Sequence, residues 1–205
     1  ASAPDERQVG GVIMPKIITE DDIEQAAIAA LHERHNYGVL SCYTKAPEAL
    51  PDNTGRANKR QTVLPEVLLE RLKAINPAIP EGTVRSVADE ISRPSLSGDL
   101  MLTNFGNYQK IRDGVTVQYK ENGRITSNRL RLIDFETPSN NSFIVASQMW
   151  IRGDMHWRRP DLLIFVNGLP LVFIELKNSN IDILLATTII ESGLDVGRAN
   201  TIIID

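Results

Sequence analysis

Two carboxylates and one ammonium group flank the most apolar segments of the chain: Asp161, Glu175 and Lys177. Two carboxylates held side by side repel each other unless a cation lies between them, and hard oxygen ligands select Mg²⁺ or Mn²⁺. Such an ion would polarise a phosphoryl oxygen and lower the pKa of a bound water, while Lys177 would orient that water or offset charge on the phosphate. These residue types therefore predict metal-dependent phosphodiester hydrolysis. The alternative is a surface hairpin with ordinary solvated charges.

A β-hairpin is the element that would bring these charges together. Residues two apart on a strand share a face, so Glu175 and Lys177 project together. If the loop between the two apolar strands has three residues (167–169), Asp161 lies opposite Glu175. A two-residue loop would pair Asp161 with Ile174, on the other face. The left-handed backbone that a glycine in the loop readily adopts favours the three-residue loop.

Helix signals dominate the first half of the chain. Thr19 is a good N-cap, and the apolar residues that follow it at helical spacing predict one core face: Ile23, Ala26, Ala27, Ala30 and Leu31. Pro65 is expected to begin a second amphipathic helix, whose apolar face is Val67, Leu68, Leu72 and Ile75. Two more helices are expected around Val84–Ile91 and Asp99–Arg112. The segment Ala46–Arg60 lacks periodicity and is expected to be a loop over the surface.

Alternating or continuous apolar runs predict strands in the second half. The expected strands are Val115–Tyr119, Leu130–Phe135, Ser142–Ile151, Leu162–Val166 and Leu171–Lys177. The last two are apolar on both faces, which is typical of central strands. Helices followed by a strand-rich half predict an α/β or α+β domain with a mixed sheet.

Composition limits the classes of function that the chain can have. The 205 residues are 42% apolar, which is enough for a globular core, and the net charge is only −4. A globally basic nucleic-acid coat is therefore excluded, and any DNA contact must come from a local patch. The sequence has neither a run of roughly 18 apolar residues nor a signal-peptide pattern, so a cytoplasmic location without membrane contact is expected. The lone Cys42 is expected to be a small buried side chain.

The pattern Pro160-Asp161 followed by Glu175-x-Lys177 resembles that of the restriction-endonuclease-like nuclease superfamily. Further segments, in the same order, resemble the N-terminal nuclease domain of the type I restriction enzyme R subunit over roughly residues 16–178. These segments are Ile18–Gln25, Leu64–Val67, Arg131–Phe135, Arg158–Asp161 and Phe165–Leu171. The resemblance implies an α/β fold with a restriction-endonuclease-like mixed β-sheet core flanked by helices, and a Mg²⁺-dependent DNA endonuclease.

Carried onto this sequence, the resemblance implies that Asp161 and Glu175 are metal ligands and that Lys177 is the catalytic lysine. Glu24 matches an acidic helix residue that often reaches the same metal site in this superfamily, and a solvated surface charge is the alternative. Guanidinium groups suit phosphates, so three arginines near Asp161 are candidates for DNA contact, with a solvated edge as the alternative. These are Arg152, Arg158 and Arg159.

After Asn178 the resemblance to the nuclease family is expected to end, which divides the chain into a nuclease domain (1–178) and a short tail (179–205). The tail resembles a motif of superfamily-two DNA translocases of the transcription-repair coupling factor type, carried by Thr187, Thr188, Gly193 and Asp195. The sequence contains no phosphate-binding G-x-x-x-x-G-K-S/T loop, so ATP binding by this chain is not expected. The tail is therefore interpreted as strands packed on the nuclease sheet, not as an independent domain.

The sequence as a whole predicts the endonuclease domain of a type I restriction–modification enzyme R subunit, acting on double-stranded DNA with Mg²⁺ or Mn²⁺. In the family, such a domain works with an ATP-driven translocase and with modification and specificity subunits. Two alternatives stay open at this point. One is a catalytically idle docking module that keeps the nuclease fold, and the other is a fragment of a DNA translocase.

Overall fold

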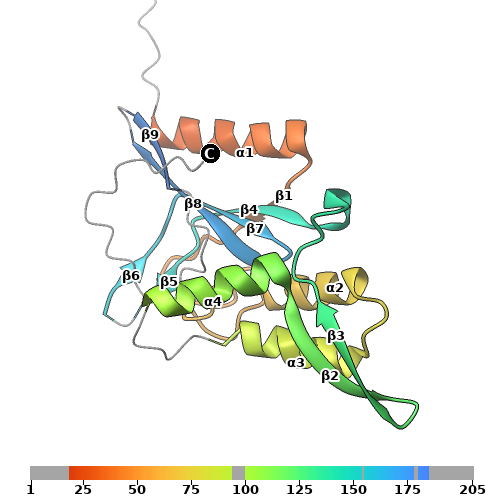
Figure 1. Ribbon diagram of the computed structural model, residues 1–205. Helices are drawn as coiled ribbons and strands as arrows, with labels where there is room; N and C mark the ends of the chain where they lie inside the picture. Colours follow the sequence, from red (N-terminus) through yellow and green to blue (C-terminus); the bar gives the residue numbers. More distant parts are fainter. Residues whose placement is uncertain (1–18, 94–99, 154, 178–179, 185–205) are drawn as a thin grey trace, which may run out of the picture.

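A five-stranded mixed sheet forms the centre of the computed structural model, which describes residues 19–93, 100–153, 155–177 and 180–184 (Figure 1). The strands, in their order across the sheet, are β1 (Gly38–Ser41), β4 (Phe143–Ser147), β7 (Leu162–Val166), β8 (Leu169–Lys177) and β9 (Asn180–Leu184). β1 runs parallel to β4, and the other neighbours are antiparallel. The prediction of a mixed α/β fold is confirmed, and the apolar β7 is the central strand.

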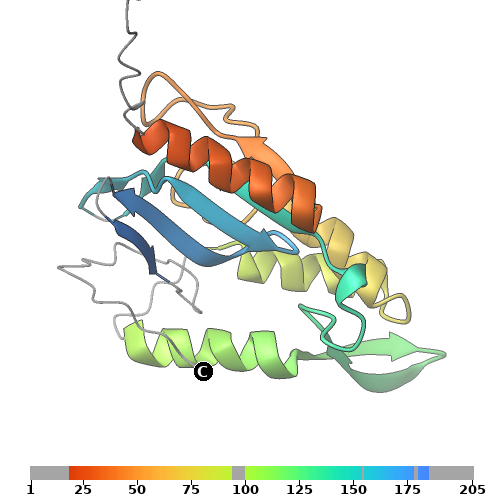
Figure 2. The same ribbon diagram turned by 90° about the horizontal axis from the view of Figure 1, so that it is seen from above.

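Helices lie on both sides of this sheet (Figures 1 and 2). The helices are α1 (Glu20–His35), α2 (Pro65–Ile75), α3 (Glu81–Ile91) and α4 (Leu100–Asp113). α1 lies along one face, and α2 and α3 lie on the opposite side. α2 begins at Pro65 as predicted, and its residues Leu68, Leu72 and Ile75 are buried. They pack with residues of α3 and with Leu130, Leu132 and Leu169 in a hydrophobic cluster beside the sheet.

α1 departs from its predicted packing. Thr19 is its N-cap, as expected, with reciprocal hydrogen bonds to Asp22. Four residues of the predicted apolar face are partly buried, and the prediction is wrong at Ala26, which is exposed. The buried residue of the helix is Glu24, which the prediction did not include. The apolar side chains of α1 are thus only partly buried against the sheet, and the most enclosed side chain of the helix is the Glu24 carboxylate.

The turn between β7 and β8 sets the register of the central hairpin. The loop has two residues, Asn167 and Gly168, with φ of 53° and 83°, so the predicted three-residue loop is wrong. A bulge on β8 opposite Ile164/Phe165 then shifts the pairing by one residue. Leu162 consequently pairs with Ile174, and the same register continued one step outward sets Asp161 opposite Glu175.

Glycine is required at position 168 by its positive φ and also by the lack of space for a Cβ. A Cβ at position 168 would lie 2.7 Å from the Leu64 carbonyl oxygen and 2.8 Å from the Leu68 nitrogen. The Leu64 N–H donates to the Gly168 carbonyl at 2.9 Å. The turn therefore packs directly against the start of α2. This contact fixes the turn end of the hairpin, which is the end opposite to Asp161.

Two of the predicted strands end earlier than expected. The hairpin β2 (Val115–Glu121) and β3 (Arg124–Leu130) projects away from the sheet, and the predicted strand Leu130–Phe135 is wrong beyond its first residue (Figure 1). Side-chain amides replace sheet partners there: Asn76 accepts from the Arg131 N–H, and Asn141 accepts from the Asp134 N–H.

The predicted strand Ser142–Ile151 is interrupted by Gln148, whose φ is 58°. β4 therefore ends at Ser147, and a short hairpin follows, formed by β5 (Ile151–Arg152) and β6 (Trp157–Arg158). A 3-10 turn, η1 (Pro138–Asn140), precedes β4. Among the described helices, none is long and apolar enough to cross a membrane.

Candidate active site

Asp161 lies at the start of β7 and closes the ladder between β7 and β8. Its Oδ2 accepts a hydrogen bond from the Leu176 N–H at 2.6 Å. This contact ties the Asp161 carboxylate to the backbone directly after Glu175, whose side chain is half-buried. Two carboxyl-bearing residues of adjacent strands are thus held at the same edge of the central hairpin.

Glu24 reaches this edge of the sheet from α1. Its side chain is only 7% exposed, and its Oε2 accepts a hydrogen bond from Gln148 Nε2 at 2.9 Å. Burial raises the pKa of Glu24, the Gln148 hydrogen bond lowers it, and the negative charges of Asp161 and Asp21 raise it further. The net pKa is above the usual value. The charge of Asp161 therefore acts on Glu24 across the interface between α1 and the sheet.

Gln148 connects the Glu24 carboxylate to the backbone of Asp161 and is a residue that sequence reasoning missed. Its side chain donates to Glu24, and its backbone N–H donates to the Asp161 carbonyl at 3.4 Å. The left-handed backbone of Gln148 breaks β4 at this point. A polar amide inside the apolar run Ser142–Ile151 was the one signal available in the sequence.

Lys177 follows Glu175 by two residues on β8 and pairs with Asn180 of β9. Strand alternation puts positions 175 and 177 on the same side of the sheet. The Lys177 side chain lies outside the described part of the structure. Among the described residues, no group of three or more His, Cys, Asp or Glu side chains is arranged so that it could hold a metal ion.

The three predicted DNA-contacting arginines differ in their surroundings. Arg152 and Arg159 are exposed, and each guanidinium lies over a tryptophan ring: Arg152 over Trp157 at 4.9 Å, and Arg159 over Trp150 at 5.1 Å. The two rings pack edge to face, with centroids 6.4 Å apart. Arg158, on β6, is half-buried. Arg159 also lowers the pKa of Glu24 by its charge, so it acts on the carboxylate cluster.

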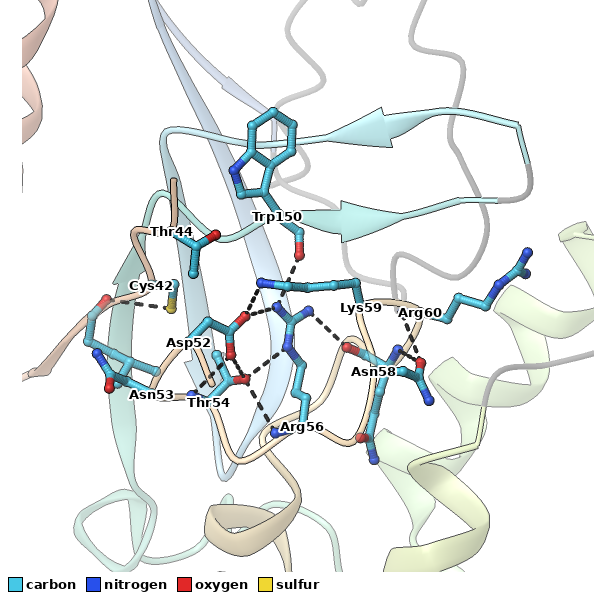
Figure 3. Close-up of polar contacts among 12 residues, drawn as sticks. Cys42, Thr44, Asp52, Asn53, Thr54, Arg56, Asn58, Lys59, Arg60 and Trp150 are labelled. Atoms are coloured by element: carbon cyan, nitrogen blue, oxygen red, sulfur yellow. Dashed lines mark hydrogen bonds and ion pairs between the residues drawn. The ribbon is translucent and has the colours of Figure 1, made fainter. Parts of the chain in front are cut away.

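A buried ion cluster supports the segment that carries Trp150 and Arg152 (Figure 3). Asp52 accepts from Arg56 Nη2 at 2.5 Å and from Lys59 Nζ at 2.6 Å, and the side chains of all three are almost fully enclosed. Arg56 also donates to the Trp150 carbonyl at 3.0 Å, and the Arg152 N–H donates to the Lys59 carbonyl at 2.9 Å. The predicted loop Ala46–Arg60 is therefore irregular as expected, but the prediction that it only covers the surface is wrong.

Electrostatics within this cluster favour ionised Asp52. Burial alone would raise its pKa, but hydrogen bonds from Lys59, Thr54 and Arg56 outweigh burial and lower the pKa to about 2. Cys42, also in the neighbourhood, is fully buried as predicted. Burial, together with the negative charge of Asp52, raises the pKa of its thiol to about 12, so the thiol stays protonated.

Known proteins related to type I restriction enzyme R subunits match most of the chain. Residues 17–191 match the family described as Type I restriction enzyme R protein N terminus (HSDR_N). The chain is 37% identical over 169 residues to the type I restriction enzyme HindI endonuclease subunit of Haemophilus influenzae, covering 79% of this chain and 15% of that protein. It is 30% identical over 159 residues to the putative type I restriction enzyme MjaIXP endonuclease subunit of Methanocaldococcus jannaschii, covering 76% and 15%. The chain thus spans 15% of the length of these relatives.

The family match continues to residue 191, so the expectation that the resemblance ends after Asn178 is wrong. Asn180–Leu184 form β9, which pairs with β8 at the edge of the sheet. The residues that carry the translocase-like resemblance, Thr187, Thr188, Gly193 and Asp195, lie outside the described residues. The division into a nuclease domain and a tail stays a prediction.

Proposed function

This chain belongs to the family of type I restriction enzyme R protein N-termini, and we propose that it is an endonuclease domain that hydrolyses DNA phosphodiesters with Mg²⁺ or Mn²⁺. Two relatives that it matches are named as endonuclease subunits, which supports nuclease activity in general. The observation that carries the proposal is the position of Asp161 at the edge of the central hairpin, where its Oδ2 accepts from the Leu176 N–H and its charge acts on the buried Glu24 of α1.

Asp161 and Glu175 are the proposed metal ligands, and Glu24 is a proposed further ligand. Their chemistry fits a hard divalent cation, because all three supply carboxylate oxygens. Asp161 Oδ2 is used by the Leu176 N–H, whereas Oδ1 makes no hydrogen bond within the described part of the chain. Mg²⁺ is commonly held by one or two carboxylates completed by water and substrate phosphate, so a cage of three protein groups is not required. This reconciles the proposal with the lack of a preformed cage among the described side chains.

Each protein group has a distinct proposed task. The Leu176 N–H holds the Asp161 carboxylate in orientation, and Gln148 does the same for Glu24. Lys177 would offset the charge that builds on the phosphate or orient the attacking water. When bound, a divalent ion would polarise a phosphoryl oxygen and lower the pKa of a bound water.

The activity of the longer protein is a further part of the proposal, since this chain spans 15% of its relatives. We expect the complete enzyme to need an ATP-driven translocase and modification and specificity subunits, and to act on double-stranded DNA in the cytoplasm. ATP is a cofactor only of that longer protein, since this chain contains no sequence motif that would bind it.

Plasmid nicking tests the proposal directly. The 205-residue chain is incubated with supercoiled plasmid and Mn²⁺ or Mg²⁺, with EDTA as the blank, beside Asp161→Asn, Lys177→Ala and the matched surface control Asp89→Asn. We expect nicking by the wild type and by Asp89→Asn that both site variants lose. Equal nicking by all four proteins would show contamination and would overturn the assignment.

Metal titration by calorimetry separates cleavage from site formation. Saturable Mn²⁺ binding that Asp161→Asn abolishes supports the metal site even where the isolated chain cuts poorly. Absence of both cleavage and metal binding would favour the docking-module alternative, in which the fold is kept without the chemistry.

A further inference from the structure

We propose that Arg152 and Arg159, each stacked on a tryptophan, form a clamp for the phosphates of one strand of duplex DNA beside Asp161. This inference rests on the proposed function, because it names how the DNA would be held at that site. The clamp is defined here as Arg152, Trp157, Trp150 and Arg159. It is the surface formed by the β5–β6 hairpin and the residues just before β5 and just after β6.

Charge distinguishes this surface from the chain as a whole. The net charge of the chain is −4, yet residues 148–160 contain three arginines and one aspartate. Because phosphate neutralisation dominates DNA affinity, an acidic protein needs a local basic surface to bind DNA at all. Both arginines of the clamp are exposed, so their N–H edges are available to a ligand from solvent.

Stacking prepares the arginines for phosphate. Each guanidinium carbon lies over an indole ring, 4.9 Å from the ring centroid for Arg152 and 5.1 Å for Arg159. A stacked guanidinium keeps its N–H edges free for hydrogen bonds and loses less side-chain freedom on binding than a solvated one. The edge-to-face packing of Trp150 and Trp157 joins the two stacks into one unit.

The backbone beneath the clamp is anchored from below. Arg56 of the buried ion cluster donates to the Trp150 carbonyl, and the Arg152 N–H donates to the Lys59 carbonyl. Figure 3 shows Trp150 directly above Arg56 and Lys59. Anchoring at both positions holds the two residues that begin the hairpin, so the clamp is a preformed surface and not a solvated edge.

The position of the clamp relates it to the carboxylates. Arg159 precedes Asp161 by two residues, so the clamp continues directly into the start of β7, where the candidate metal site lies. In the proposed complex, Arg159 would bind a phosphate beside the one at Asp161. Arg158, the remaining arginine predicted for DNA contact, is half-buried on β6 and is not part of the clamp.

Intrinsic fluorescence offers a selective test, because the chain has two tryptophans and both are in the clamp. The 205-residue chain is titrated in EDTA and low salt with a short DNA duplex, so binding is measured without cleavage. We expect a saturable change in tryptophan emission. Arg152→Gln and Arg159→Gln should each weaken binding about tenfold and reduce the slope of log affinity against log salt by about one.

Arg124→Gln is the matched control, since it removes one exposed arginine from the β2–β3 hairpin, which projects away from the sheet (Figure 1). We expect its affinity and salt slope to stay close to those of the wild type. Equal weakening by all three glutamine variants would indicate a diffuse charge effect and would overturn the clamp. So would wild-type binding that leaves the tryptophan emission unchanged.

Arg152→Lys tests the stacking itself, because lysine keeps the charge without the planar face. We expect affinity between those of the wild type and Arg152→Gln, and full wild-type affinity would overturn the stacked clamp. Asp161→Asn separates this inference from the nuclease proposal. It should bind DNA at least as well as the wild type while losing cleavage, so failure of the clamp and failure of hydrolysis produce different results.

Discussion

Asp52 and Glu24 are both buried carboxylates, yet their surroundings are opposite. Asp52 is enclosed by Arg56, Lys59 and the Thr54 hydroxyl, and its pKa is lowered to about 2. Glu24 accepts a hydrogen bond from the neutral amide of Gln148, and its pKa is raised. The negative charge of Asp52 is therefore paired with two buried cations. Glu24 has a neutral hydrogen-bond donor in their place.

If the proposed function holds, this difference separates a structural ion cluster from a metal site. A buried carboxylate without a close cation costs free energy, and carboxylates with a shifted pKa are common at functional sites, which fits the proposed metal site. Asp161 adds a second negative charge near Glu24, which leaves negative charge in excess there. Arg159 offsets part of it but is exposed and stacked on Trp150. A divalent cation would supply at the Glu24 edge what Arg56 and Lys59 supply at Asp52.

Asp52→Asn should give the largest change in stability. The substitution leaves Arg56 and Lys59 buried without their carboxylate, which is expected to cost about 3 kcal/mol or more of the free energy of unfolding. Urea denaturation, followed by circular dichroism, measures the loss. Asp89→Asn, which removes an exposed aspartate from α3, is the control and should change stability by less than about 0.5 kcal/mol. A similar small effect for Asp52→Asn would remove the distinction between the two regions.

Asp161→Asn should change stability little and DNA cleavage strongly. Its amide oxygen can still accept from the Leu176 N–H, so we expect the free energy of unfolding to stay within about 0.5 kcal/mol of the wild type. Divalent-dependent nicking should fall by more than about a hundredfold, since even residues behind a metal ligand typically matter by tenfold or more. Denaturation and nicking are measured on the same preparations. A large loss of stability would place Asp161 with Asp52, as a structural residue.

The fold was predictable where the signal is local. The Thr19 cap, the proline that begins α2 and the apolar β7 each depend on neighbouring residues, and each prediction is confirmed. The strand predicted at Leu130–Phe135 failed because side-chain amides take up its backbone N–H groups: Asn76, which is distant in the sequence, and Asn141, which follows the segment. Such partners cannot be read from periodicity.

The candidate site was predictable in its hairpin carboxylates and less so in its supports. The register at Asp161 followed from strand alternation, although a two-residue turn and a bulge produce it in place of a three-residue loop. Gln148 and the buried cluster around Asp52 were missed, since both consist of polar residues in segments that look apolar or loop-like. Their roles arise from contacts between elements, which no local pattern encodes.

Acid should remove the contribution of Asp52 selectively. Its pKa in the folded protein, about 2, lies below the usual 3.8, so its ionised form stabilises the fold above about pH 4. The stabilisation is lost as the pH falls toward 2, and the shift corresponds to about 2 kcal/mol. We therefore expect the difference in free energy of unfolding between the wild type and Asp52→Asn to shrink by about that amount from pH 5 to about pH 2. A constant difference would contradict the charge pairing.

Glu24→Gln should have the smallest effect on stability, and it should stabilise the fold where Asp52→Asn destabilises it. The neutral side chain can keep its hydrogen bond from Gln148 while removing a buried charge, so we expect the free energy of unfolding without divalent ions to rise at neutral pH. Because the pKa of Glu24 is raised in the folded protein, this gain should grow as the pH rises above the usual value and vanish below it. Thermal unfolding measures it, with the exposed Glu33→Gln on the same helix as the control.

With Mg²⁺ present, the wild type should become more stable than Glu24→Gln. The ion stabilises the folded wild type by mass action and binds Glu24→Gln less well. If Glu24→Gln were less stable than the wild type even without the ion, Glu24 would be part of the framework, as Asp52 is. The excess of negative charge at this edge of the sheet would then no longer point to a missing cation.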